Sequence, residues 1–113
     1  MRRVTMMLAA MAIVVLLSAA AAYAATITGT ERMDELFESN RDDRITARAG
    51  ADEIDATKFT DDTDRVRGNR GADTIDITDG DILDTANGGK GSDTCTGDFG
   101  ERFISCETIV PPV

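Results

Sequence analysis

An aspartate recurs every nine residues along much of this chain, and a small or aliphatic side chain follows it two positions later. The aspartates are Asp34, Asp43, Asp52, Asp64, Asp73, Asp84 and Asp93, followed by Leu36, Ile45, Ile54, Val66, Ile75, Ala86 and Cys95. One further step of nine gives Arg102 and Ile104, and residues 56–58 and 77–78 interrupt the spacing. A short fixed period predicts a solenoid, in which each unit buries its apolar residue against its neighbours.

Glycine precedes the aspartate in the most regular copies. The stretches 50–54, 71–75 and 91–95 each place a glycine two residues before the aspartate. Further glycines precede it at Gly68, Gly88 and Gly89. At all of these positions we expect glycine to take a positive φ, so that the backbone can turn tightly and direct its carbonyl groups towards a shared centre. A turn that binds a metal and then leads into a buried strand requires this order of residues.

The unit resembles the hemolysin-type calcium-binding nonapeptide, or RTX repeat, with the pattern G-G-x-G-x-D-x-U-x, where U is a large apolar residue. The copy at 88–96 departs from this pattern only at Cys95, and the copy at 68–76 has Asn69 in place of one glycine. The resemblance covers residues 29–105. It implies an all-β fold, a parallel β-roll or β-solenoid of short strands, in which each unit makes half a coil. The repeat aliphatic residues, from Leu36 to Ile104, would form the interior column.

The same resemblance implies that a calcium ion (Ca2+) lies between the turns of units that are two apart. Calcium accepts six to eight oxygen ligands at about 2.3–2.6 Å and tolerates mixed carbonyl and carboxylate sets. Asp52 would contribute on the same side of the coil, whereas Asp64 would pair with Asp43 or Asp84 on the other side, in turns that lack the glycines. The predicted ligands of the best site are Gly68, Arg70, Gly71, Asp73, Gly88, Gly89, Lys90, Gly91 and Asp93.

The first residues have the composition of a secretory signal peptide. Arg2 and Arg3 precede an apolar stretch at 4–17, and Ala22-Tyr23-Ala24 fits the small-x-small rule for cleavage. We therefore predict a cleaved signal helix at 1–24, a mature domain at 25–113 and a secreted protein without a membrane segment. An uncleaved anchor is the alternative, and the export route, general secretion or twin-arginine, is left open.

The charge of the chain favours cations as ligands. The formal net charge is −9, and it becomes −11 without residues 1–24, which hold two arginines and no acidic residue. Such a chain has no electrostatic reason to bind nucleic acid or an anionic membrane. Without calcium the aspartates would repel one another, so we expect metal binding to be coupled to folding.

Cys95 and Cys106 are the only cysteines. An even pair in an exported chain predicts a disulfide, which would close the C-terminal end of the coil. The chain has no histidine, which removes the usual acid–base and nucleophile-relay sites, and no EF-hand pattern.

These features predict a calcium-binding module that is not an enzyme. Two other readings stay open. One is a metal-free acidic β-solenoid that acts as an interaction or structural protein towards an unidentified cell-surface partner. The other is a fragment of a larger enzyme.

Overall fold

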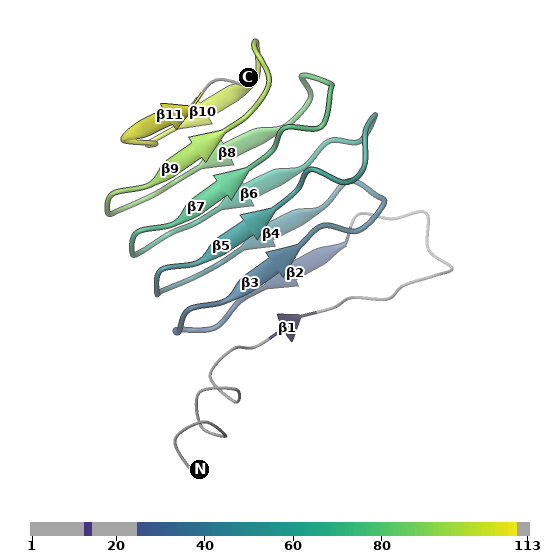
Figure 1. Ribbon diagram of the computed structural model, residues 1–113. Coiled ribbons are helices and arrows are strands. Elements are labelled where there is room, and N and C mark those ends of the chain that lie inside the picture. The colour runs from purple at the N-terminus through teal and green to yellow at the C-terminus, as the bar shows by residue number, and fades with distance from the viewer. Residues whose placement is uncertain (1–12, 15–24, 111–113) are drawn as a thin grey trace, which may run out of the picture.

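The computed structural model describes residues 13–14 and 25–110, which form a solenoid of short parallel strands (Figure 1). One sheet has the order β1 (Ile13–Val14), β3 (Glu35–Phe37), β5 (Glu53–Asp55), β7 (Thr74–Asp76), β9 (Thr94–Thr96) and β11 (Thr108–Val110). The other has the order β10 (Arg102–Ile104), β8 (Thr85–Asn87), β6 (Arg65–Arg67), β4 (Arg44–Thr46) and β2 (Thr26–Thr28). From β2 onwards, successive strands alternate between the sheets, so each nine-residue unit makes half a coil. The predicted all-β parallel solenoid is confirmed.

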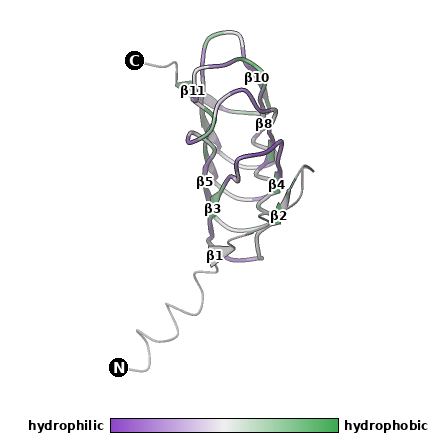
Figure 2. Ribbon diagram, turned by 90° about the vertical axis from the view of Figure 1, so that its right-hand side faces the viewer, coloured by the Kyte–Doolittle hydropathy of each residue, from purple (hydrophilic) through white to green (hydrophobic). Residues whose placement is uncertain are grey.

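The two sheets face each other across a narrow space (Figure 2). The middle residue of most strands is buried in it. In one sheet, Leu36 lies beside Ile54, Ile54 beside Ile75, and Ile75 beside Cys95. In the other, the aligned residues are Ile27, Ile45, Val66 and Ala86. All eight are at most 1% exposed. Parallel in-register pairing therefore converts the nine-residue spacing into two continuous aliphatic columns.

The last strand of the second sheet departs from the nine-residue count. Arg102 pairs with Thr85 and Phe103 with Ala86, because the turn before β10 is one residue shorter than expected. Phe103, rather than the predicted Ile104, packs against the core. Glu101, rather than the predicted Arg102, therefore follows the repeat aspartates in the stack.

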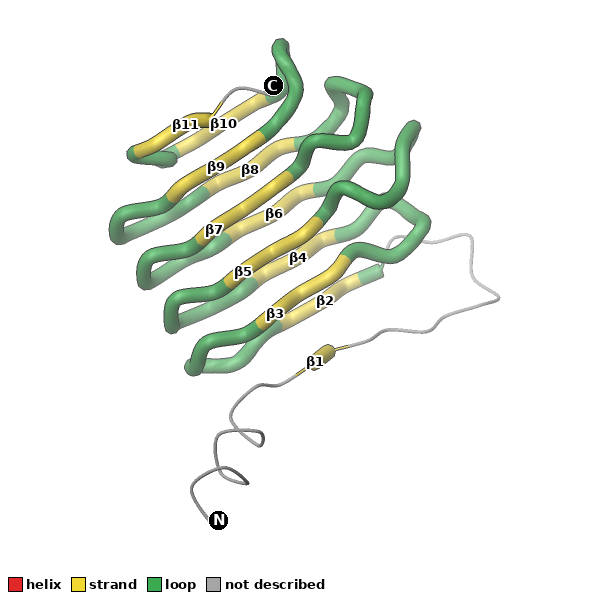
Figure 3. Tube along the Cα trace, viewed as in Figure 1, coloured by secondary structure: helices red, strands yellow, loops and turns green. Residues whose placement is uncertain are grey.

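The turns at the two edges of the coil differ in length (Figure 3). They also differ in composition. We call one edge the glycine flank; it consists of residues 29–34, 47–52, 68–73, 88–93 and 105–107. The opposite edge, the acidic flank, consists of residues 38–43, 56–64, 77–84 and 97–101. The interrupting residues 56–58 and 77–78 both lie on the acidic flank. They lengthen its turns without disturbing the strands.

The C-terminal end of the coil is closed by a disulfide. Cys95 in β9 is bonded to Cys106 in the turn before β11, with their Cα atoms 5.9 Å apart. The predicted disulfide is confirmed. It ties β11 to the sheet at the end where no further coil covers Ile109, which is 51% exposed.

The predicted signal helix lies outside the described residues, except for Ile13 and Val14. These two residues are extended and pair with Glu35 and Leu36 of β3. Over the described part of the chain there is no helix that is long and apolar enough to cross a membrane.

Candidate metal centre

Stacked aspartates line the interior of the glycine flank. The N–H of Asp34 donates to Asp52 Oδ1 at 2.8 Å. The N–H of Asp52 donates to Asp73 Oδ1, and that of Asp73 to Asp93 Oδ1, both at 2.9 Å. Glu107 Oε1 ends the series by accepting from the N–H of Asp93 at 2.9 Å. Each bond joins a carboxylate to the backbone of the preceding coil, and charge-assisted bonds of this kind fix the orientation of the carboxylate.

The second oxygen of these carboxylates has no hydrogen-bond donor. The Oδ2 atoms of Asp52, Asp73 and Asp93 are buried and unpaired, and the three residues are at most 2% exposed. Burial, opposed by the backbone hydrogen bond and reinforced by neighbouring aspartates, raises the pKa of Asp52 to about 6 and that of Asp73 to about 7. Burial also raises the pKa of Asp93. Unpaired buried oxygens are costly, and a bound cation would both pair them and keep them ionised.

The backbone of the glycine-flank turns follows one repeated pattern. The second residue is left-handed in three units, at Arg48 (φ 73°), Asn69 (φ 68°) and Gly89 (φ 83°). The fourth is glycine with a still larger φ, 104° at Gly71 and 111° at Gly91. A Cβ on Gly91 would collide with the carbonyl oxygen of Gly71 in the adjacent coil. Backbone oxygens therefore lie close to the next turn, where calcium would find carbonyl as well as carboxylate ligands.

The first glycine of the unit has a different purpose from the one expected. Gly68 and Gly88 do not have a positive φ, so the sequence-based argument was wrong for this position. A Cβ on Gly88 would lie 2.7 Å from Asp93 Oδ2 and 2.6 Å from the carbonyl oxygen of Ser105. Glycine there leaves room for the aspartate carboxylate. Ala47 shows that a methyl group is tolerated in one unit, where it is fully buried.

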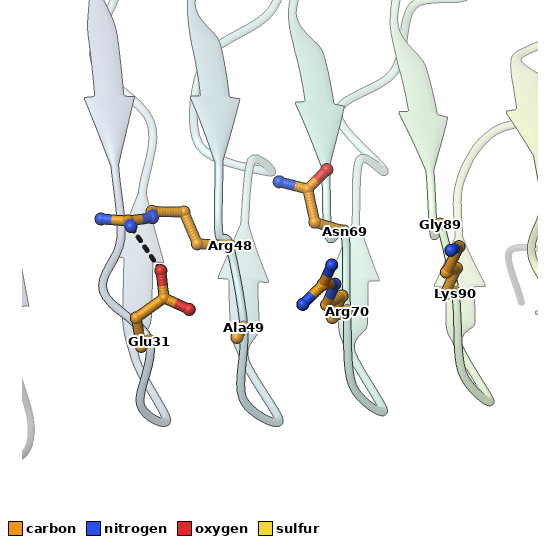
Figure 4. Close-up of a pocket in the computed structure, with 7 residues that line it drawn as sticks. All are labelled: Glu31, Arg48, Ala49, Asn69, Arg70, Gly89 and Lys90. Carbon is orange, nitrogen blue, oxygen red and sulfur yellow. Dashed lines mark ion pairs between the residues drawn. The ribbon is translucent and has the colours of Figure 1, made fainter.

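A shallow groove crosses the outer surface of the glycine flank (Figure 4). Its lining residues are Glu31, Arg48, Ala49, Asn69, Arg70, Gly89 and Lys90. Arg48 forms an ion pair with Glu31, whereas the side chains of Arg70 and Lys90 are exposed. Because both side chains are cationic, these two residues would bind a metal only through their backbone carbonyl oxygens.

The repeat pattern is recognised in comparison with known families. A sequence profile for the RTX calcium-binding nonapeptide repeat (4 copies) matches residues 38–59, 60–81 and 83–104, more than half of the chain. The chain belongs to this family. Its RTX repeats imply calcium as the ion for the turns. Neither a curated protein nor a solved structure shows a significant match to the chain.

The structure gathers most of the predicted RTX ligands on one flank. Asp64 is the exception, because it lies on the acidic flank, where it accepts from the N–H of Asp43 at 2.8 Å and donates its own N–H to Asp84 at 2.7 Å. It therefore belongs to a separate stack. The residues that do lie together, in three adjacent glycine-flank turns, are Asp52, Gly68, Arg70, Gly71, Asp73, Gly88, Gly89, Lys90, Gly91 and Asp93. Their role as ligands stays a prediction.

The acidic flank holds carboxylate clusters that are larger than the predicted pairs of Asp64 with Asp43 or Asp84. The oxygens of Glu38, Asp43 and Asp64 approach within 4.8 Å of one another, as do those of Asp62, Asp64 and Asp84 and those of Asp79, Asp81, Asp84 and Glu101. Burial raises the pKa of Asp64 to about 9 and that of Asp62 to about 6. The signal in the sequence was the position of Asp62, Asp79 and Asp81 inside the lengthened turns, where the nine-residue pattern does not require an acid.

Proposed function

We propose that this chain is a secreted calcium-binding module in which calcium lies between the RTX turns of the glycine flank and is coupled to folding. The observation that carries the proposal is the row of buried carboxylate oxygens without donors at Asp52, Asp73 and Asp93. Carbonyl oxygens of the adjacent glycine turns supply the second ligand type. The ion would be held by residues 68–73 and 88–93, with Asp52 supporting the neighbouring turn.

Coupling to folding follows from the composition of the interior. The aliphatic columns are narrow, and the ten buried polar or charged residues of the described chain are all acidic. Across residues 25–110 the single ion pair joins Arg48 to Glu31, so no arginine or lysine neutralises the buried aspartates. Ionising several such groups without a counter-ion opposes folding, whereas calcium binding adds its own free energy to the folded state.

Secretion and a binding role are each supported by two features. The disulfide between Cys95 and Cys106 is typical of oxidising, extracellular compartments, and the predicted leader agrees with export. The absence of histidine from the sequence and the repetition of one turn favour a binding module over an enzyme.

The test is a calcium titration of the full chain followed by far-UV circular dichroism. We expect β structure to increase as calcium rises towards the millimolar range of extracellular modules, about 10⁻⁴–10⁻³ M. Asp73→Asn removes one buried carboxylate and is expected to raise the calcium midpoint about tenfold, since affinity follows ligand charge. Asp61→Asn is the matched control, because Asp61 is exposed and its φ of 62° suits asparagine.

The outcomes separate the alternative readings. A spectrum that is already fully β in a chelator and does not change up to about 10 mM calcium would favour the metal-free acidic solenoid. An equal shift for Asp73→Asn and Asp61→Asn would show that bulk charge, rather than the turn site, determines the response.

A further inference from the structure

Four carboxylates meet on the acidic flank near the C-terminal end of the coil. Asp79, Asp81 and Asp84 come from the turn between β7 and β8, and Glu101 comes from the turn between β9 and β10. One oxygen of each residue lies within 4.8 Å of the others. Asp84 continues the stack of repeat aspartates, whereas Asp79 and Asp81 belong to the lengthened part of their turn. We call these four residues the acidic quartet.

All four members of the acidic quartet accept hydrogen bonds from backbone N–H groups. Both oxygens of Asp81 do so, from the N–H of Asp61 and from that of Leu83, each at 2.8 Å. Asp79 Oδ1 accepts from the N–H of Asp81 at 3.0 Å, and Asp84 Oδ1 accepts from the N–H of Asp64 at 2.7 Å. Glu101 Oε2 accepts from the N–H of Asp98 at 2.7 Å. In Asp79, Asp84 and Glu101 these bonds orient the carboxylate and occupy only one of its two oxygens.

The remaining oxygen of each of these three residues is buried and has no donor. The atoms are Asp79 Oδ2, Asp84 Oδ2 and Glu101 Oε1. Asp79 and Glu101 are 9% exposed and Asp84 is 1% exposed. Leaving a buried acceptor unpaired opposes folding, and more strongly so for a charged group. Local turn geometry explains the bond from Asp81 to Asp79, but it does not explain three unpaired oxygens in one place.

No basic side chain compensates the acidic quartet. The one ion pair recorded between residues 25 and 110 lies on the glycine flank, at Arg48 and Glu31. Burial, together with repulsion from Asp79 and Asp81, raises the pKa of Asp84 to about 8 against the backbone hydrogen bond from Asp64. A compact group of carboxylates with this arrangement has the ligand chemistry of hard divalent cations.

We propose that Asp79, Asp81, Asp84 and Glu101 form a second calcium site, separate from the glycine-flank turns. The site differs in kind from the RTX turn, because side chains supply its protein ligands. Gly80, in the turn that supplies Asp79, Asp81 and Asp84, has open space around the position of a Cβ, with no atom within 4 Å. Asp81, which is half-buried, lies at the rim, and water would complete the calcium shell.

The first test counts calcium ions bound per full chain by native mass spectrometry and measures their affinities by calorimetry. Glu101→Gln removes one buried charge from the acidic quartet, and we expect one ion fewer per chain while the remaining ions bind as before. Glu53→Gln is the matched control, since Glu53 is exposed on β5. An unchanged count and unchanged affinities for Glu101→Gln would overturn the proposal.

The second test locates the ion in the unaltered chain and so does not depend on a variant that folds. Mn2+ broadens the NMR signals of nearby amides and replaces calcium at carboxylate sites. We expect broadening at 79–84 and 98–101, reversed by excess calcium, in addition to broadening at 68–73 and 88–93. Broadening confined to the glycine flank would overturn this site and leave the proposed function standing. Broadening confined to the acidic quartet would support this site and overturn the proposed glycine-flank site.

Discussion

Glycine at the fourth position of the glycine-flank turns meets two separate demands. Gly71 has a φ of 104°, which disfavours any residue with a Cβ, and a Cβ there would also collide with the carbonyl oxygen of Gly50. Gly80 on the acidic flank meets only the first demand, since its φ is 97° and a Cβ there would have no atom within 4 Å. A comparison of substitutions at the two glycines therefore distinguishes the cost of backbone strain from the cost of a steric collision.

We predict that Gly71→Ala destabilises the calcium-bound chain more than Gly80→Ala. The left-handed conformation costs an alanine about 1–2 kcal/mol at either site. At Gly71 the collision with the Gly50 carbonyl adds to that cost and separates two coils, so a total above about 3 kcal/mol is expected. Urea unfolding followed by circular dichroism measures both. Equal losses for the two variants would contradict the close approach between coils.

At the residue scale the sequence was sufficient to place the repeat aspartates and the fourth-position glycines in the turns, because the motif specifies both directly. It failed for Gly88, whose role depends on the distance from its own Cα to Asp93, and for Glu101. Contacts across a turn are set by where the chain folds back, and spacing along the chain does not contain that information.

At the scale of the element, the three-residue strands determine the register and the turns absorb all changes in length. Successive glycine-flank aspartates are 18, 21 and 20 residues apart, yet each occupies the same place in its coil. The parallel solenoid could be predicted because its period survives these insertions. The turn before β10 instead loses one residue, and a count of nine then assigned the wrong side chain to the core.

Phe103 and Ile104 test that register. We predict that Phe103→Ala lowers the free energy of unfolding by about 2–3 kcal/mol, because Phe103 is partly buried against the core beside Ala86. Ile104→Ala should cost less than about 1 kcal/mol, since Ile104 pairs with Asn87 away from the columns. Thermal unfolding in saturating calcium compares the two. A larger loss of stability for Ile104→Ala than for Phe103→Ala would mean that Ile104 occupies the core position, as the nine-residue count predicts.

At the scale of the whole molecule, the pKa values of the buried carboxylates are all shifted in the same direction. Their pKa values are raised to about 6 at Asp52, about 7 at Asp73 and Glu101, and about 8 at Asp84, chiefly by burial. In the unfolded chain the same groups titrate near 4. The metal-free folded state therefore holds protons that the unfolded state has already released, and this difference sets the sign of its pH dependence.

We predict that the metal-free chain becomes less stable as the pH rises from 5 to 8. The stabilising contribution of the protonated carboxylates is complete below their unfolded pKa and is lost as the pH passes through the raised values, each group contributing up to about 1.4 kcal/mol per pH unit. Calcium binds the ionised form, so in saturating calcium neither the folded nor the unfolded chain holds these protons over this range, and the slope should be close to zero. Urea unfolding of dialysed, metal-free protein and of calcium-loaded protein, at the same pH values, measures both slopes.

Asp73→Asn removes one titrating group and should make the metal-free slope shallower, whereas Asp61→Asn should leave it unchanged. A metal-free chain whose stability rises between pH 5 and 8 would mean that these carboxylates are hydrated and ionised rather than buried as the structure places them.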